Sequence, residues 1–326
     1  MASHDNVYQL VREAFQRISP FVEKTRIIKS VDFSNEFGCR LFLKMENEQR
    51  TGSFKLRGAY NKLYQMKDKN ITVVTSSTGN HGLGCLDAMK RFDIKGKIIV
   101  PKTISSIKKE KLEGKGATLH FHGTDCEESE SFAREYSNSN KDVEYISPYN
   151  DIDIIAGQGT IAVEILNDVP DVDYVFVSVG GGGLMSGIAS YIKNTSPKTK
   201  IIGCQPEASP VMLESVKTGN IVEYESQPTL SEGTAGGIEQ NSITFPICKD
   251  LVDHWEIISV EDIKWGINFM WRTERAVVEG AAGMALAAAR NMANDIKGKT
   301  ACVVLCGGNI DKSIVESIVS DQTKKP

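Results

Sequence analysis

The sequence predicts an α/β protein in which helices flank parallel β-sheets. Short runs of β-branched residues alternate with helical segments along the chain, which is the pattern of consecutive βαβ units. The 326 residues, of which 40% are hydrophobic and 25% charged, correspond to roughly two domains of about 150 residues each. These figures exclude a disordered, collagen-like or disulfide-rich chain.

The first expected element is an amphipathic helix that begins near Asp5. Val7, Val11 and Ile18 belong to a set of apolar residues that recur at helical spacing. A secretory signal would need a continuous apolar core, and the acidic Asp5 and Glu13 do not suit a transit peptide. We therefore expect a cytoplasmic protein.

Eight β-strands are expected after this helix. They cover residues 40–45, 72–76, 97–100, 117–122, 143–147, 174–179, 200–204 and 302–305. Residues 72–150 contain four of these strands and are expected to form a small domain, inserted into a large domain made of residues 1–71 and 151–326. The highly charged segment 107–115 is interpreted as the solvated face of a helix.

The charge balance and the apolar runs exclude some classes of partner, and the cysteines indicate the redox state of the thiols. The chain carries 38 basic and 42 acidic residues and a net charge of −4, so neither nucleic acid nor a membrane surface is expected to bind it. Its apolar runs are far shorter than the ~20 residues that span a bilayer. The seven cysteines are an odd number and lie far apart, mostly inside apolar stretches, which favours reduced, buried thiols.

A glycine-rich segment, residues 178–187, follows an expected strand and precedes a helix. Its four consecutive glycines, Gly180 to Gly183, allow several backbone N–H groups to converge on one anion. The helix that follows adds its positive N-terminal end, so this segment predicts a phosphate site, with a plain tight turn as the alternative. Residues 157–162 resemble a dinucleotide fingerprint only superficially, and we interpret them as the start of a packed helix.

Two further segments carry candidate chemistry. Lys55 is flanked by Phe54 and Leu56, and apolar neighbours favour the neutral amine that forms a Schiff base. Taken alone, such a lysine is more often a surface cation. Residues 76–82 join a strand to a helix, where unpaired N–H groups and nearby hydroxyls suit a carboxylate, although a simple helix cap fits equally well.

The last candidate segment is residues 302–309. Cys302 and Cys306 would lie ~13 Å apart on one strand, which is too far for a shared zinc ion. Cys306 ends the strand just before two glycines, and ligands of α/β sheets bind at this end of the strands.

Together, these segments resemble fold-type II pyridoxal-phosphate enzymes of the serine/threonine dehydratase and serine racemase group. The resemblance covers residues 7–318 and rests on residues 53–59, 77–81, 180–184 and 306–309, which occur in the family's order. It implies a tryptophan synthase β-like fold with two open, twisted, mostly parallel sheets flanked by helices. It also implies pyridoxal 5'-phosphate as cofactor, an amino-acid substrate and a homodimer.

The resemblance also implies the role of each site residue. Lys55 would be the Schiff-base lysine and catalytic acid/base, and Cys306 would face the pyridine nitrogen, where a thiol favours rapid loss of a β-substituent. The other cofactor contacts would come from Phe54, Asn80, Gly180, Gly181, Gly182, Gly183, Leu184 and Gly233. The substrate carboxylate would be bound by Ser77, Thr78, Gly79, Asn80 and His81.

Three positions depart from the family's pattern. Thr78 stands where the racemases have Ser and the dehydratases usually have Ala, and Glu232 replaces an Asp. Metal-dependent members carry two carboxylates where this chain has Gln205, Ser209 and Val211, so we expect no metal at that position.

The expected activity is dehydration of an L-β-hydroxy-amino acid, of the threonine or serine type, to a 2-oxo acid and ammonia. Within the family, the alternatives are an amino-acid racemase that uses Thr78 as a second acid/base, a dehydratase of 3-hydroxyaspartate or phenylserine, and a β-replacement enzyme. From other classes, the less favoured alternatives are a catalytically silent cofactor-binding protein and a nicotinamide oxidoreductase.

Overall fold

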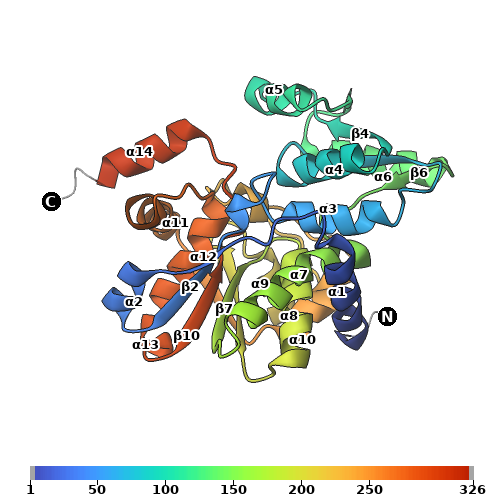
Figure 1. Ribbon diagram of the computed structural model, residues 1–326. Coiled ribbons are helices and arrows are strands. Elements are labelled where there is room, and N and C mark those ends of the chain that lie inside the picture. Colours follow the sequence, from blue (N-terminus) through green and yellow to red (C-terminus); the bar gives the residue numbers. More distant parts are fainter. Residues whose placement is uncertain (1–3, 323–326) are drawn as a thin grey trace.

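The computed structural model, which describes residues 4–322, contains two β-sheets surrounded by helices (Figure 1). All neighbouring strands are parallel except for β1, which pairs with β2 in the antiparallel direction. The α/β fold with two mostly parallel sheets is thus confirmed. The larger sheet has the spatial order β1 (Ile27–Lys29), β2 (Arg40–Lys44), β10 (Thr300–Val304), β7 (Tyr174–Ser178), β8 (Lys200–Pro206) and β9 (His254–Ile258). The smaller has the order β5 (Leu119–Phe121), β4 (Lys95–Val100), β3 (Thr72–Ser76) and β6 (Val143–Tyr145).

Helices cover both sheets. In chain order they are α1 (His4–Ile18), α2 (Val31–Phe37), η1 (Glu46–Glu48), α3 (Lys55–Tyr64), α4 (Asn80–Arg91), α5 (Ser106–Gly114), α6 (Cys126–Ser139), α7 (Ile152–Asp168), α8 (Gly183–Thr195), α9 (Val211–Thr218), η2 (Glu232–Thr234), α10 (Thr244–Leu251), α11 (Val260–Phe269), η3 (Met270–Glu274), α12 (Gly280–Asn291), α13 (Ala293–Ile296) and α14 (Lys312–Gln322). None of the helices within the described residues is long and apolar enough to cross a membrane.

The local sequence explains where the central elements form. Strand β3 is the β-branched run TVVTS, and its three middle residues are buried. Helix α7 begins where the Asp151 carboxylate accepts hydrogen bonds from the N–H groups of Asp153 and Ile154. The helix is buried on most of its surface because α1, α3 and α8 all pack against it. It is therefore the central helix of the molecule.

The structure corrects several details of the sequence interpretation. Strands β1 and β9 were missed, because both lie at sheet edges and neither has a continuous run of buried apolar residues. Residues 157–162 lie inside α7 and do not start it, since the helix begins five residues earlier. All seven cysteines are free, but Cys126 is exposed and not buried.

The strands of the smaller sheet lie inside the expected small domain, but a helix outside that range packs against them. The smaller sheet is built from strands that lie within residues 72–145. Helix α3, which precedes that range, nevertheless shares a hydrophobic cluster with it: Leu56, Ala59 and Leu63 pack with Val73 and Met89. The boundary of the small domain at residues 72–150 stays a prediction.

Candidate active site

The predicted site residues gather where the two sheets face each other. Residues 77–81 follow β3, residues 180–184 follow β7, and Cys306 follows β10, so all three groups lie at carboxyl ends of parallel strands. Such ends are the usual position of ligand sites in α/β sheets. Lys55 joins them as the first residue of α3.

The amine of Lys55 is buried, and burial disfavours its charged form. Its Nζ donates a hydrogen bond of 2.8 Å to the Pro148 carbonyl and lies 5.3 Å from the centre of the Phe54 ring. The Phe54 N–H donates to the Cys306 carbonyl at 3.0 Å. Burial lowers the pKa of Lys55 to about 8, although nearby acidic groups oppose the shift. Roughly a tenth of the amine is therefore neutral at pH 7, far more than for a lysine in water.

The glycine loop lies against Tyr149, the residue after Pro148. A Cβ on Gly181 would come within 2.5 Å of the Tyr149 ring, and one on Gly183 would come within 2.9 Å of its Cα. Gly182 has φ +85° and precedes α8 without any side-chain cap among the described residues. The first N–H groups of α8 are thus available to an anion, while Leu184 is buried in the first turn behind the loop.

The segment after β3 forms the opposite side of the site. The Ser77 hydroxyl accepts a hydrogen bond from the Gly79 N–H at 3.2 Å, and a Cβ on Gly79 would meet nothing within 4 Å. Thr78 is half-buried. The open space beside Gly79 leaves room for a ligand at the N-terminus of α4.

His81 points away from this space. Its Nε2 lies 3.0 Å from the Ile146 carbonyl and 3.5 Å from the Cys85 sulfur. Burial, together with the positive charge of Lys55, lowers the pKa of His81 to about 3, so its ring is neutral. This orientation leaves the backbone N–H of His81, and not its ring, for a carboxylate.

A polar chain joins the two sides of the site. The Asn80 amide donates to both oxygens of Glu279 at 2.9 Å and accepts a hydrogen bond from Asn309 at 2.6 Å. Asn309 also donates to the Thr51 carbonyl and accepts from the ammonium of Lys111. The chain thus connects α4 and α5 to the segments before α12 and after β10.

Cys306 is a neutral thiol in this environment. Its side chain is 2% exposed, and burial, followed by the charge of Glu279, raises its pKa well above the ordinary value. A protonated thiol next to a pyridine nitrogen would leave that nitrogen without a negative partner.

The remaining predicted contacts lie around η2. A Cβ on Gly180 would come within 2.9 Å of the Thr234 Cα and 3.3 Å of the Gly233 carbonyl, which places η2 against the glycine loop. Glu232 pairs with Lys108 of α5 at 3.1 Å. The charged helix α5 is therefore not only a solvated face, because Lys108 and Lys111 both reach across to the other side of the site.

At the position where the sequence predicts no metal, the polar side chains are hydrogen-bonded to other protein groups. The buried Gln205 amide donates to the Val179 carbonyl at 3.1 Å and accepts from the Leu213 N–H at 2.8 Å. The Ser209 hydroxyl shares a hydrogen bond of 2.7 Å with Ser226, and Val211 is buried. Within residues 4–322, no group of three or more His, Cys, Asp or Glu side chains is arranged to hold a metal ion.

Sequence reasoning missed three side chains of the site. Tyr149 lies on the glycine loop, and Glu279 and Asn309 hold Asn80. Glu279 had a detectable signal, because it is a lone acid between apolar and small residues. Tyr149 had none, since its contact with Gly181 joins residues 32 positions apart in the chain.

Comparison with known proteins places this arrangement in a family. The family model described as "Pyridoxal-phosphate dependent enzyme" matches residues 18–307. The L-threonine ammonia-lyase of Thermotoga maritima is 37% identical over 312 residues, which are 95% of this chain and 77% of that protein.

Solved structures agree with this result. Threonine deaminase isoform 2 of Solanum lycopersicum, in its processed form, has a TM-score of 0.92 at 29% identity, with 98% of this chain and 94% of that chain covered. A pyridoxal 5'-phosphate-dependent aspartate racemase has a TM-score of 0.86 at 31% identity, with 94% and 97% covered.

Proposed function

Because this chain belongs to the family of pyridoxal-phosphate dependent enzymes, we propose that it is an ammonia-lyase that acts on an L-β-hydroxy-amino acid. The substrate would be of the threonine or serine type. It would lose water, and hydrolysis of the resulting enamine would give a 2-oxo acid and ammonia. The observation that carries the proposal is the Lys55 amine, which lies between an uncapped glycine loop and an open helix N-terminus.

The residues present fit pyridoxal phosphate. Gly180 to Gly183 and the first turn of α8 would hold the phosphate, since no side chain caps the start of this helix. Tyr149 lies so close to Gly181 that only glycine fits there. Lys55 would bind the aldehyde carbon, Phe54 would lie beside the ring, and Gly233 would lie near it. The Asn80 amide would face the ring hydroxyl, and the neutral thiol of Cys306 would face the ring nitrogen.

Pyridoxal phosphate, when bound, withdraws electrons from the α-carbon of an amino acid and so acidifies its proton. The chain's own residues would place and move that proton. Lys55, once displaced by the substrate amine, would accept it at Nζ, and a pKa of about 8 suits this exchange. Ser77, Thr78, Gly79, Asn80 and His81 would orient the substrate through its carboxylate, with His81 contributing its backbone N–H.

A racemase is the second candidate, since the aspartate racemase is similar in fold and 31% identical. Racemisation requires a second acid/base on the face of the substrate opposite Lys55, and Thr78 is the predicted group. The two activities share Lys55 and differ in the fate of the β-hydroxyl.

A substrate panel tests both candidates. Release of 2-oxo acid is measured with threonine, serine, 3-hydroxyaspartate and phenylserine in both configurations, and residual substrate is analysed by chiral chromatography. Borohydride reduction and peptide mass mapping should place the pyridoxyl group on Lys55. Racemisation without 2-oxo acid would replace the lyase by the racemase, and a label on another lysine would refute the site.

We also propose that the enzyme is a homodimer. Val31 of α2 and Trp271 of η3 are exposed apolar residues on neighbouring segments, which a 2.6 Å hydrogen bond from Ser30 to Glu274 joins. Sedimentation of the holoenzyme measures the mass, and a monomer at micromolar concentration would refute this part of the proposal.

A further inference from the structure

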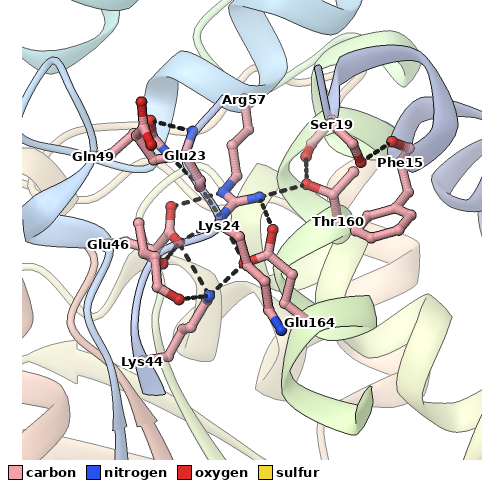
Figure 2. A network of polar contacts seen from close by, with 12 residues as sticks. Phe15, Ser19, Glu23, Lys24, Lys44, Glu46, Gln49, Arg57, Thr160 and Glu164 are labelled. Carbon is pink, nitrogen blue, oxygen red and sulfur yellow. Dashed lines mark hydrogen bonds and ion pairs between the residues drawn. The ribbon is translucent and has the colours of Figure 1, made fainter. Parts of the chain in front are cut away.

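Four ionisable side chains form a buried cluster on which the first turn of α3 is anchored (Figure 2). Lys44 comes from β2, Glu46 from η1, Arg57 from α3 and Glu164 from α7, and their side chains are only 0–4% exposed. Two positive and two negative groups balance one another. The cluster therefore joins the consecutive elements β2, η1 and α3 to α7, which lies about a hundred residues later.

Arg57 is the centre of this cluster. Its Nε and Nη2 donate to the two oxygens of Glu46, both at 2.8 Å. Its Nη1 and Nη2 donate to the two oxygens of Glu164 at 2.8 and 2.9 Å, and Nη1 also donates to the Thr160 hydroxyl at 3.2 Å. The guanidinium thus forms a two-pronged pair with each carboxylate, which a lysine ammonium has no geometry to reproduce.

Arg57 follows Lys55, the residue of the reacting amine, by two positions in the sequence. Arg57 and Lys55 both belong to the first turn of α3. The same turn rests on α7 at Gly157, where a Cβ would come within 2.6 Å of the Arg57 carbonyl and the Gly58 Cα. On its other side, the Phe54 N–H binds the Cys306 carbonyl. The start of α3 is therefore fixed from two directions.

Stability alone gives a poor reason for such a cluster. Burying four charges carries a large desolvation cost, and well-packed apolar residues often stabilise a core as well or better. Buried, fully paired charges hold the elements that carry them in a precise geometry, because each hydrogen bond restricts direction as well as distance.

We propose that Arg57 is a positioning residue that fixes the first turn of α3 and so aims the Lys55 amine at the cofactor and substrate. The inference rests on the proposed function only in taking Lys55 as the reacting amine. Glu46 and Glu164 serve as the two anchors of Arg57, and Lys44 neutralises the second negative charge.

The test compares Arg57→Lys with Arg50→Lys. Arg50 lies on the same loop before α3 and pairs with Asp87 at 3.1 Å, but it is half-exposed, so it controls for the loss of a guanidinium in this segment. The rate at which apo protein takes up pyridoxal phosphate, followed by visible absorbance, reports on Lys55 without any turnover. Thermal unfolding reports on the fold, and kcat and KM are measured per bound cofactor.

Arg57→Lys is expected to slow cofactor uptake about tenfold and to lower kcat at least tenfold, with KM within about twofold. Arg50→Lys should leave all three within twofold. Glu164→Gln keeps the shape of the side chain and should shift uptake and kcat in the same direction by about threefold.

Unchanged cofactor uptake and unchanged kcat per bound cofactor in Arg57→Lys would overturn the inference, as would an equal loss in Arg50→Lys. Slowed cofactor uptake in a folded Arg57→Lys protein would support it even if no amino acid of the panel were turned over. That last outcome would refute the proposed function alone.

Discussion

The cofactor side and the substrate side of the site are held in different ways. On the cofactor side, α3 begins with Lys55 and carries Arg57 in a cluster of buried charges with exposures of 0–4%, and the glycine loop is in tight contact with Tyr149. On the substrate side, α5 is joined to η2 by the pair of Lys108 and Glu232, whose side chains are 46% and 72% exposed. Water and salt screen such exposed pairs strongly.

This difference has a consequence for ligand binding. The groups of the cofactor side are held by contacts with one another in the core. The substrate side depends on a few polar contacts across the gap between the sheets, chiefly those of Asn80, Asn309 and Lys111. Substitutions on the first side should therefore have large effects, and those on the second side small ones.

The largest effect is expected at Lys55, whose burial disfavours its charge. In the apo protein, Lys55→Met should stabilise the fold at pH 7 by on the order of 3 kcal/mol, because the pKa is about 8 when folded and about 10.4 when unfolded. The gain should shrink as pH rises from about 8 to 10.5. Over this range the folded wild type has already lost the Lys55 proton, whereas the unfolded chain still binds it, so the wild type becomes more stable with pH.

Urea unfolding of both apo proteins at several pH values measures this difference, and all other titrating groups cancel between them. A gain that stays constant with pH would mean that the charge of Lys55 is not the cause. Lys55→Met should also abolish turnover.

Gly181 tests the cofactor side without changing any charge. A methyl group in Gly181→Ala would meet the Tyr149 ring at 2.5 Å, so the glycine loop would have to move away from Tyr149. Because the moved loop would no longer fit the phosphate, affinity for pyridoxal phosphate should fall roughly 10- to 100-fold. Gly79→Ala is the matched change on the substrate side, where a Cβ meets nothing within 4 Å. It should raise KM while leaving cofactor affinity within about twofold. Equal losses of cofactor affinity, measured by fluorescence titration, would erase the distinction between the two sides.

The segments expected on the cofactor side carry stronger sequence signals than those expected on the substrate side, and the reason is local. Lys55 and Gly180 to Gly183 carry their signals in consecutive residues, because a helix start and a glycine turn are properties of short segments. Their gathering at carboxyl ends of strands follows from the parallel sheets. The strands themselves were found wherever a buried β-branched run marked them.

The details that the sequence leaves open depend on distant partners. The orientation of the His81 ring is decided by the Ile146 carbonyl just after β6, and the contact of Glu279 by Asn80, 199 residues earlier. The contacts of α5 likewise require knowing that η2 lies opposite. No short pattern encodes such pairings, so single-sequence reasoning interpreted α5 as a solvated face.

Thr78 gives a smaller expected effect, on the substrate side. Elimination needs only Lys55 and an acid near the leaving group, so Thr78→Ala should keep kcat for 2-oxo-acid release within about threefold. A β-branched side chain is confined to few rotamers, and Thr78→Ser should therefore raise racemisation relative to elimination. Chiral chromatography alongside 2-oxo-acid release measures both. Faster racemisation than elimination in the native protein, abolished by Thr78→Ala, would reverse the order of the two candidates.

Removal of divalent cations should have little effect on activity. The Gln205 amide already links the Val179 carbonyl, which precedes the glycine loop, to the start of α9. Neutral side chains at this position offer no charge to offset the dehydration of Mg²⁺ or Ca²⁺. Activity after EDTA treatment should stay within about twofold of the untreated enzyme. A large loss that Mg²⁺ restores would contradict this expectation.

The smallest effect is expected at Lys108, on the substrate side. Lys108→Ala removes the exposed pair with Glu232, and pairs as exposed as this one lie at the low end of the range of about 0–1 kcal/mol, so KM should rise by about twofold or less at low salt. The increase should vanish near 0.5 M salt, where the Debye length falls to roughly 4 Å. Lys109→Ala is the control, because Lys109 pairs with Glu113 on the same helix and does not reach η2. A tenfold, salt-independent rise in KM for Lys108→Ala would mean that this contact is desolvated during binding, and that the substrate side is held as firmly as the cofactor side.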